Sequence, residues 1–293
     1  MIVVRLMGGL GNQLFQYAAG RALSLKHNTE LQFDFSYLNA DPNPNYTKRQ
    51  LELDLFGLKI TEVKASELEK FKSTSFIKRV LRKLFGNSFS NYFVANQSEF
   101  CFLPEFNSYT KNTYLNGYWQ SEKYFLGIRE KLLKELVITK SKNEQVIKAE
   151  NEILNSKAVS LHIRRGDYVS LKSAIEHHGV LPLEYYYLAI HEIKKQHEDI
   201  TVFVFSDDIT WVKESLKLSD KCVYIDFNKG KDSVFDMYLM SLCKHNIIAN
   251  SSFSWWGAWL NQNPDKIVVA PKNWFTNKEI PTNDLIPDKW IRL

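Results

Sequence analysis

Two adjacent arginines, Arg164 and Arg165, follow a segment whose apolar and polar residues alternate as in a β-strand. A guanidinium presents a fixed fork of donors that matches phosphate oxygens in pairs, and open α/β sheets hold ligands at their strand ends. The glycine that comes next permits a sharp turn, so this stretch predicts an anion-binding corner. The alternative is a surface salt bridge between Arg165 and Asp167, which leaves His162 inside the strand without a role.

Two further polar clusters follow apolar runs in the second half of the chain. Asp207 and Asp208 come directly after one run, and Ser251 and Ser252 come after another, at the start of a predicted helix. Because the carboxyl ends of parallel strands lie along one edge of a sheet, we expect both clusters to lie near the two arginines.

The chemistry of these clusters suits a nucleoside diphosphate. The arginines and the serine hydroxyls can donate to phosphate, as can backbone N–H groups at a helix start. Carboxylates such as Asp207 and Asp208 accept only, so they suit the N–H and O–H groups of a base or ribose, where His162 can donate or accept. The two aspartates could instead bind a divalent metal. We expect no metal, because arginines beside the phosphates can neutralise a leaving diphosphate themselves.

A glycine-rich loop follows the first predicted strand, Ile2–Leu6. It reads Gly-Gly-Leu-Gly-Asn-Gln over residues 8–13 and opens a helical pattern, an arrangement that directs backbone N–H groups toward an anion. With Asp34 in the next predicted strand, Leu31–Phe35, it permits a dinucleotide-dependent oxidoreductase as an alternative. The loop lacks the third glycine of that fingerprint, and its Asn12 and Gln13 stand where close helix packing usually requires small residues.

Strands and helices alternate on short connections from Val159 to Ala270, which predicts an α/β domain with a doubly wound parallel sheet. The stretch from Lys140 to Glu150 is charged and poor in apolar residues. We therefore expect two domains, an N-terminal one over 1–155 and a C-terminal one over 156–293.

Composition narrows the function classes. The 293 residues are 44% hydrophobic and 24% charged, typical of a soluble globular protein, and the net charge of +5 is too modest for a nucleic-acid-binding face. The three cysteines have no metal-site spacing and predict reduced thiols in a cytoplasmic protein. We expect neither a signal peptide nor a membrane-spanning segment.

Two other segments carry alternative interpretations. The stretch Glu62–Phe93 is predicted to be helical, and residues 76–85 place an apolar stripe among lysines and arginines. Such a stripe usually packs on the protein's own core, but it also permits peripheral contact with an anionic membrane surface. The stretch Tyr114–Gln120 predicts an aromatic-rich strand, which is either an ordinary strand or a sugar contact.

Four segments resemble the motifs of bacterial α-1,2-fucosyltransferases, glycosyltransferase family 11. They occur in the family's order: GGLGNQLFQ at 8–16, HIRRGDY at 162–168, SDD at 206–208 and NSSFSWWG at 250–257. The resemblance implies a GT-B-like fold, with two Rossmann-like domains facing a cleft. It also implies metal-independent, inverting transfer of L-fucose from GDP-β-L-fucose to the 2-hydroxyl of a terminal galactose on a glycan acceptor.

The same resemblance implies roles for single residues. Arg164 would stabilise the β-phosphate of departing GDP, and Arg165 would bind the donor or hold Asp167. The other donor-binding residues would come from both halves of the chain: Gly11, Asn12, His162, Asp207, Asp208, Ser251, Ser252 and Phe253.

The catalytic base is an open choice at this point. Inversion requires the acceptor hydroxyl to lose its proton, and Asp167 is the first candidate, followed by Glu176, His177 and His178. The pattern also permits two other functions: transfer of another sugar from GDP, and glycan binding without catalysis.

Overall fold

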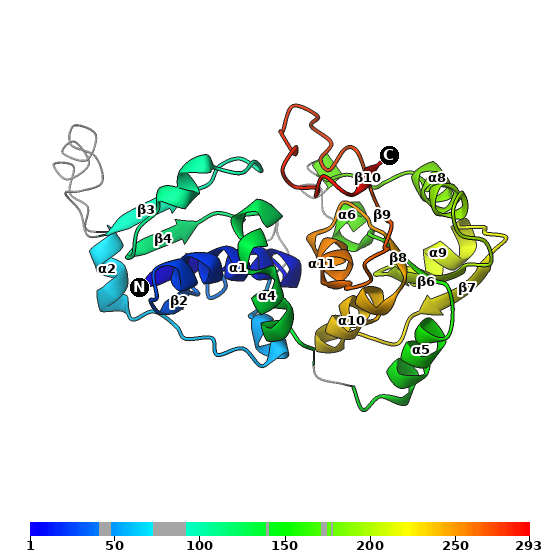
Figure 1. Cartoon of the computed structure of the whole chain (residues 1–293), viewed down its shortest axis with the longest axis horizontal. Coiled ribbons are helices and arrows are strands. Elements are labelled where there is room, and N and C mark those ends of the chain that lie inside the picture. The colour runs from blue at the N-terminus through cyan, green and yellow to red at the C-terminus, as the bar shows by residue number, and fades with distance from the viewer. Residues whose placement is uncertain (41–47, 73–91, 139–140, 171–174, 177) are drawn as a thin grey trace. The chain divides into compact units, whose positions relative to one another are not determined.

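The computed structural model describes residues 1–40, 48–72, 92–138, 141–170, 175–176 and 178–293, apart from the side chains of Asp167 and Ser170. The chain forms two compact units, each built on a parallel β-sheet (Figure 1). Unit 1 comprises residues 1–41, 48–136 and 281–285, and unit 2 comprises residues 42–47, 137–280 and 286–293.

Unit 1 contains a four-stranded sheet in the order β2-β1-β4-β3. Its strands are β1 (Ile2–Arg5), β2 (Leu31–Asp34), β3 (Phe93–Asn96) and β4 (Thr113–Asn116), and its α-helices are α1 (Leu10–Lys26), α2 (Ala65–Lys72) and α4 (Arg129–Glu135). Short 3₁₀ turns η1 (Leu53–Phe56), η3 (Pro104–Ser108), η4 (Glu122–Tyr124) and η5 (Leu126–Ile128) complete it. The Arg21 guanidinium joins α1 to α4 through a 2.6 Å ion pair with Glu135.

Unit 2 contains a six-stranded sheet in the order β10-β9-β8-β5-β6-β7. The strands are β5 (Ala158–Ile163), β6 (Thr201–Ser206), β7 (Lys221–Ile225), β8 (His245–Ile247), β9 (Val268–Ala270) and β10 (Ile291–Arg292). The helices are α5 (Glu144–Leu154), α6 (Gly166–Ser170), α8 (Leu183–Lys194), α9 (Ile209–Ser215), η6 (Gly230–Ser233), α10 (Val234–Leu242) and α11 (Ser252–Leu260). The predicted doubly wound parallel sheet is confirmed.

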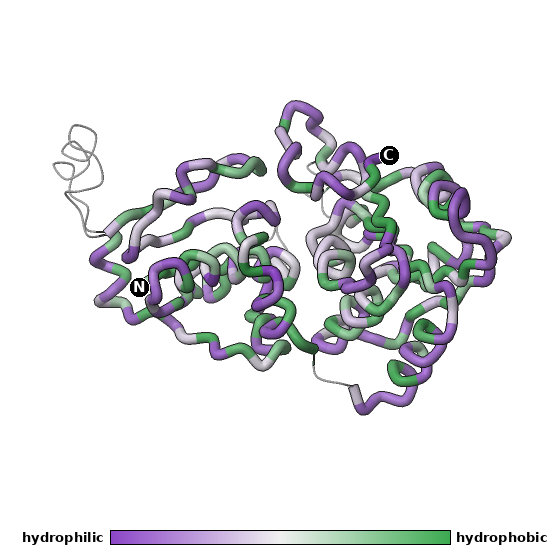
Figure 2. The backbone as a smooth tube through the Cα atoms, viewed as in Figure 1, coloured by the Kyte–Doolittle hydropathy of each residue, from purple (hydrophilic) through white to green (hydrophobic). Residues whose placement is uncertain are grey.

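Alternate residues of β5 face opposite layers of unit 2. Val159, Leu161 and Ile163 pack with α8 and α9, whereas Ala158 packs with α5 and α10. Helices therefore cover both faces of the sheet (Figure 1). The strands are consequently apolar along most of their length, as the colouring of β6 shows (Figure 2). This arrangement leaves polar side chains to the strand ends.

The division between the units falls at Leu136, earlier than the predicted boundary at 155. The charged stretch that suggested a linker is largely helix α5, whose buried Val146, Ala149 and Ile153 pack on the core of unit 2. These three apolar residues at helical spacing stabilise the helix among the charges.

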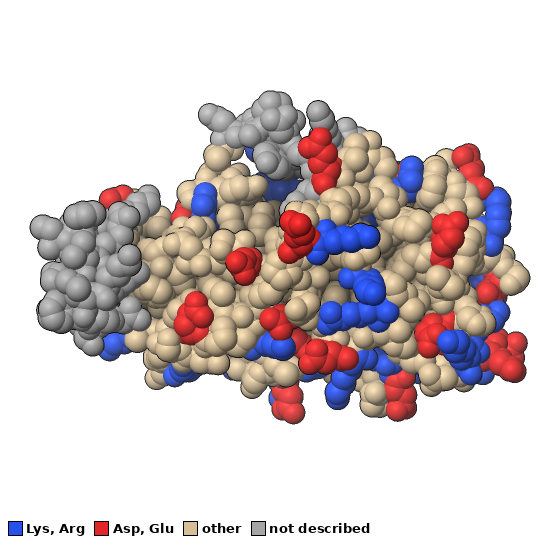
Figure 3. All heavy atoms as spheres, turned by 90° about the horizontal axis from the view of Figure 1, so that it is seen from above, with Lys and Arg blue, Asp and Glu red and all other residues tan. Residues whose placement is uncertain are grey.

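The predicted helix over 62–93 is described only in part. Helix α2 is observed, β3 begins at Phe93, and the basic stretch 76–85 lies outside the described residues. No helix in the described part of the chain is long and apolar enough to cross a membrane. Lys and Arg are interspersed with Asp and Glu on the face shown in Figure 3.

Candidate active site

One carboxylate, that of Asp207, joins the ends of β5 and β6. Its Oδ2 lies 2.8 Å from Nη1 of Arg164, and its Oδ1 accepts the backbone N–H of Arg165 at 2.8 Å. Each side chain of the ion pair is about a quarter exposed, at 24% for Arg164 and 25% for Asp207. The predicted convergence of the strand ends is confirmed here, because these neighbouring strands place an oriented guanidinium at the surface of the edge.

Gly166 is required for close approach rather than for a turn. It begins α6 without a positive φ, which corrects the expectation of a sharp turn at this glycine. A Cβ atom at this position would lie 2.4 Å from Oδ2 of Asp207. Any other residue would therefore displace the carboxylate that orients Arg164.

Arg165 is held by different partners from those of Arg164. Its Nε donates to Oδ2 of Asp208 at 3.2 Å, and its Cζ lies 3.5 Å from the centre of the Trp211 ring. Asp208 also caps α9, since its Oδ1 accepts the backbone N–H of Trp211 at 3.3 Å. The two arginines thus differ: Arg165 is clamped within the fold, and Arg164 is the more exposed of the pair.

His162 supplies a neutral imidazole inside the strand. Burial lowers its pKa to about 4, with Asp207 opposing the shift and Arg164 adding to it. Its ring centre lies 6.0 Å from that of Phe253. Within the part of the chain that the structure describes, its buried Nδ1 has no hydrogen-bond partner, so this nitrogen is available to a ligand.

The third predicted cluster also reaches this edge. β8 pairs with β5, and the segment after it carries Asn250 and Ser251, followed by α11. The Tyr168 hydroxyl donates to the carbonyl oxygen of Asn250 at 3.1 Å, which ties α6 to this segment. Phe253 in the first turn of α11 contacts His162. The three predicted segments, which follow β5, β6 and β8, therefore reach one edge of the sheet, whereas the side chain of Asp167 lies outside the described residues.

Asn250 was not predicted as a site residue, although it lies within a recognised motif. Its side-chain amide donates to the carbonyl oxygens of His178 at 2.9 Å and Trp274 at 3.3 Å. The His178 ring stacks on Tyr168 with centres 4.7 Å apart. These contacts fix the chain on either side of the strand end.

The candidate bases are only partly described. Glu176 is exposed and His178 is stacked and half-buried, whereas His177 and the side chain of Asp167 lie outside the described residues. The choice among them stays a prediction.

The glycine loop of unit 1 holds an internal carboxylate at the start of α1. Glu52 accepts the backbone N–H of Leu10, and burial raises the pKa of its carboxyl. Gln13 bridges the loop to the same segment, since its amide donates to the carbonyl oxygen of Gly8 at 2.9 Å and accepts from the N–H of Glu52 at 3.0 Å. Asn12 accepts from Gln120 at 2.7 Å.

These contacts explain the two amide residues in the loop. Gln13 holds together loops that small residues would leave unconnected. Gly11 and Asn12 belong to unit 1, and their predicted approach to the donor stays a prediction.

Asp236 is a buried carboxyl that the sequence analysis did not single out. It lies in the first turn of α10, burial raises its pKa to about 7, and the Asn228 amide donates to it at 2.7 Å. A signal was present in the sequence, because this aspartate interrupts the apolar run Val-Phe-Asp-Met of a predicted helix. α10 begins beyond the carboxyl end of β7, at the edge that carries the other polar groups.

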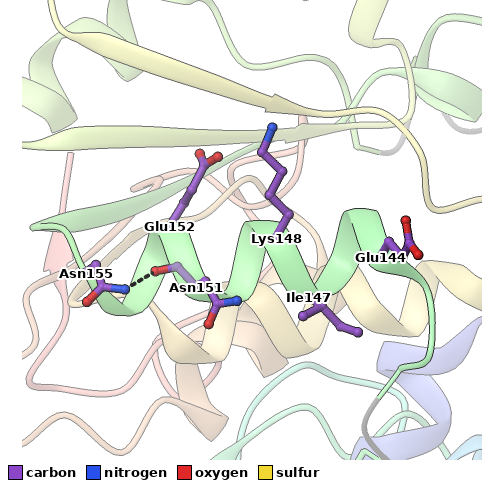
Figure 4. A pocket seen from close by; sticks show the side chains of 6 residues that line it. All are labelled: Glu144, Ile147, Lys148, Asn151, Glu152 and Asn155. Atoms are coloured by element: carbon purple, nitrogen blue, oxygen red, sulfur yellow. Dashed lines mark hydrogen bonds between the residues drawn. The ribbon is translucent and has the colours of Figure 1, made fainter.

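A separate hollow of about 480 Å³ is lined by residues of α5 and by Asn155, which follows that helix (Figure 4). Its polar residues include Lys148 and Glu152, and Asn155 donates to the backbone of Asn151 within the helix. It is distinct from the strand-end site and holds none of the predicted site residues.

The two parallel α/β units have a GT-B-like fold. The chain belongs to glycosyl transferase family 11, whose model matches residues 1–293. It is 37% identical to an alpha-1,2-colitosyltransferase of Escherichia coli over 100% of this chain and 99% of that protein.

Two further comparisons agree. The chain is 23% identical to a galactoside 2-alpha-L-fucosyltransferase of Mus musculus over 89% of this chain and 64% of that protein. A mutant form of Arabidopsis thaliana FUT1 in complex with GDP shares the fold with a TM-score of 0.50 and 12% identity, covering 98% of this chain and 74% of that one. The predicted family and fold class are confirmed.

We predict that Asp236→Asn removes a pH-dependent loss of stability. A carboxyl whose pKa rises from 3.8 to about 7 on folding stabilises the folded state fully below pH 3.8 and loses this contribution as pH rises through 7. Relative to the wild type, the variant should therefore gain on the order of 2–3 kcal/mol in the free energy of unfolding between pH 5 and pH 8. Urea unfolding at both pH values measures this.

Asp226→Asn is the matched control, because its carboxylate is exposed and paired with Lys213 at 2.7 Å. A pH-independent difference between Asp236→Asn and the wild type would show that Asp236 is ionised in the folded protein at pH 5.

Proposed function

We propose that this protein transfers L-fucose from GDP-β-L-fucose to the 2-hydroxyl of a terminal galactose on a glycan, with inversion to an α-1,2 linkage. The observation that carries the proposal is the convergence of Arg164, the neutral His162 and the start of α11 at one sheet edge of a family 11 chain. The similarity to a galactoside fucosyltransferase over most of the chain supports fucose as the sugar and galactose as the acceptor.

In this proposal Arg164 carries the chemical step. Breaking the bond between fucose and the β-phosphate leaves negative charge on GDP, and a preorganised guanidinium stabilises that charge in the transition state. The ion pair with Asp207 holds Arg164 in one orientation beforehand, so little reorganisation is needed during reaction. Arg165, held by Asp208 and Trp211, keeps the strand end in place.

The nucleoside of GDP has two candidate partners, His162 and Asp236. The free Nδ1 of His162 can bind a ribose hydroxyl or a base nitrogen. Asp207 and Asp208, which the sequence suggested for this role, are both engaged by arginines. Asp236 has no cationic partner among the described residues, and its carboxylate can accept two adjacent N–H donors of guanine.

We propose further that the reaction needs no metal ion. Arg164 provides at the diphosphate the positive charge that a divalent cation supplies elsewhere.

One relative supports a second candidate for the sugar that is transferred. The 37% identical relative is a colitosyltransferase, so colitose carried on GDP is the competing donor. A competition assay with both GDP-sugars and one galactoside acceptor separates the two by the ratio of their kcat/KM values.

Calorimetric titration with GDP, GDP-fucose, UDP and NAD, each with and without EDTA, tests the donor class. We expect GDP and GDP-fucose to bind, each with the same affinity in the presence and absence of EDTA. UDP and NAD should bind far more weakly. Binding of NAD without binding of GDP would overturn the proposal in favour of the dinucleotide-dependent alternative. Loss of GDP binding on addition of EDTA would overturn metal independence alone.

We predict that Arg164→Ala lowers kcat by roughly 100-fold or more, because removing one preorganised donor to the leaving group costs about that much. The conservative Arg164→Lys should restore only part of the rate, since an ammonium lacks the bidentate fork. Asp167→Asn should cost less than Arg164→Ala. If Asp167→Asn is equally inactive while GDP still binds, Asp167 is the catalytic base and leaving-group stabilisation alone does not account for the rate.

We also propose that the protein is cytoplasmic and that the basic stretch 76–85 contacts the membrane surface. Flotation with vesicles containing anionic lipid should carry the protein upward at low salt and much less at 0.5 M salt. Replacing Lys78, Arg79, Arg82 and Lys83 with glutamine should abolish flotation without changing GDP binding. Equal flotation of the variant and the wild type would contradict the proposal.

A further inference from the structure

Every strand of the unit 1 sheet ends in a polar residue. β1 ends in Arg5, β2 in Asp34, β4 in Asn116 and β3 in Asn96. The register pairs Arg5 with Asp34 and Asn96 with Asn116. β1 and β4 pair through Val4 and Leu115, which places Arg5 beside Asn116.

These four residues therefore form a row on one face of the sheet, which we call the edge row. Paired residues of parallel strands point to the same face, and adjacent strands are about 4.8 Å apart, so the row extends over roughly 14 Å. That length accommodates a disaccharide.

Hydrogen bonds connect the edge row. Arg5 Nη1 donates to Asn116 Oδ1 at 3.4 Å, and Asn116 Nδ2 donates to Asn96 Oδ1 at 2.8 Å. Asp34 is 4% exposed, and it accepts from the Tyr114 hydroxyl at 2.6 Å. The row thus runs from a buried carboxylate at one end to the exposed Asn96 at the other.

The inner side of the edge row is closed. One step back along the strands, on the same face, Val3, Val94 and Tyr114 belong to a hydrophobic cluster with Val63 and Phe71. A ligand of the row would therefore approach from the carboxyl end of the sheet.

Arg5 lacks the partners that a structural arginine usually has. Among the described residues its guanidinium makes one long hydrogen bond, at 3.4 Å, and its buried Nε has no hydrogen-bond partner. Tyr37, 37% exposed, places its ring centre 5.8 Å from Cζ of Arg5. A buried donor without a partner, beside amides and an aromatic face, indicates a site whose ligand supplies oxygen atoms.

We propose that the edge row binds the terminal sugar of the acceptor glycan; this inference rests on the proposed function. Arg5 donates to ring or hydroxyl oxygens, whereas Asn116 and Asn96 each donate and accept, as paired hydroxyls require. The ring of Tyr37 provides a flat apolar surface for the sugar's C–H face.

The charge of the edge row favours a neutral ligand. Arg5 carries one positive charge and the neighbouring Asp34 one negative charge, so the row is neutral as a whole. The nearby negative charge of Asp34 would disfavour a phosphate or carboxylate ligand, whereas it does not oppose a neutral polyol.

The test uses Arg5→Lys, Asn116→Ala and Asn96→Ala in the full chain, with lactose as acceptor and GDP-fucose as donor. Asn107→Ala, an exposed asparagine in η3 of the same unit, is the matched control. We expect Arg5→Lys and Asn116→Ala to raise the KM for lactose about tenfold. Each variant loses one hydrogen bond to the sugar and leaves a buried group unpaired, which has a cost of that size. The KM for GDP-fucose, kcat and the melting temperature should stay close to those of the wild type.

Lactose binding without donor, followed by saturation-transfer NMR, separates this inference from the proposed function. Loss of lactose binding in the edge-row variants but not in Asn107→Ala supports the edge row, even if the wild type fails to transfer fucose. An unchanged KM for lactose in all three variants of an active enzyme overturns the edge row and leaves the proposed function intact. A wild type that neither binds lactose nor transfers fucose to it overturns both.

Discussion

The carboxylate of Asp207 is the group on which the candidate active site depends. One oxygen accepts the backbone N–H of Arg165, and the other pairs with the guanidinium of Arg164. The absence of a side chain at Gly166 makes room for it. A single residue after β6 thereby fixes the direction in which the chain leaves β5 and the direction in which Arg164 points.

Burial determines the charge state of the remaining groups at this edge. His162 is neutral because desolvation of the imidazolium outweighs the attraction of Asp207. Burial raises the pKa of the Asp236 carboxyl to about 7, because the one hydrogen bond from Asn228 offsets only part of the cost of desolvating the carboxylate. The edge thus combines a permanent cation in Arg164, a neutral donor and acceptor in His162, and a carboxyl in Asp236 whose protonation a ligand can change. These are the three kinds of partner that a diphosphate, a ribose and a base require.

Much of unit 2 could be predicted from the sequence, because its strands are short apolar runs and its helices keep a clear period. The convergence of Arg164, Asp207 and Ser251 followed from parallel-sheet geometry alone. The pairing of Asp207 with an arginine rather than with a base could not be predicted, since it depends on which rotamers two adjacent strand ends select. The helix α5 was missed because its apolar face consists of three residues among many charges.

Unit 1 was harder to predict for a physical reason. The amides of Gln13 and Gln16 are buried, and they act by bonding to backbone groups of segments distant in the sequence, such as Gln50 and Gly117. Polar residues used in this way resemble surface residues when only the sequence is available. The residues of the edge row likewise come from four separate strands, with no local pattern that connects them.

The two sheets use the same geometry with different polar groups at their edges, and this difference argues for a division of tasks. In unit 1 the strands end in polar residues, and in unit 2 polar residues follow the ends of β5 and β6 at the carboxyl edge. In unit 2 that edge presents the partly exposed Arg164, suited to an anionic donor. In unit 1 the guanidinium of Arg5 is balanced by Asp34 and flanked by the amides of Asn116 and Asn96, a set suited to an uncharged polyol. The proposed reaction uses one anionic donor and one neutral acceptor. Under the two proposals, the partly exposed guanidinium of Arg164 would bind the diphosphate and the amides of the edge row would bind the sugar hydroxyls, so that each substrate meets its own kind of polar partner.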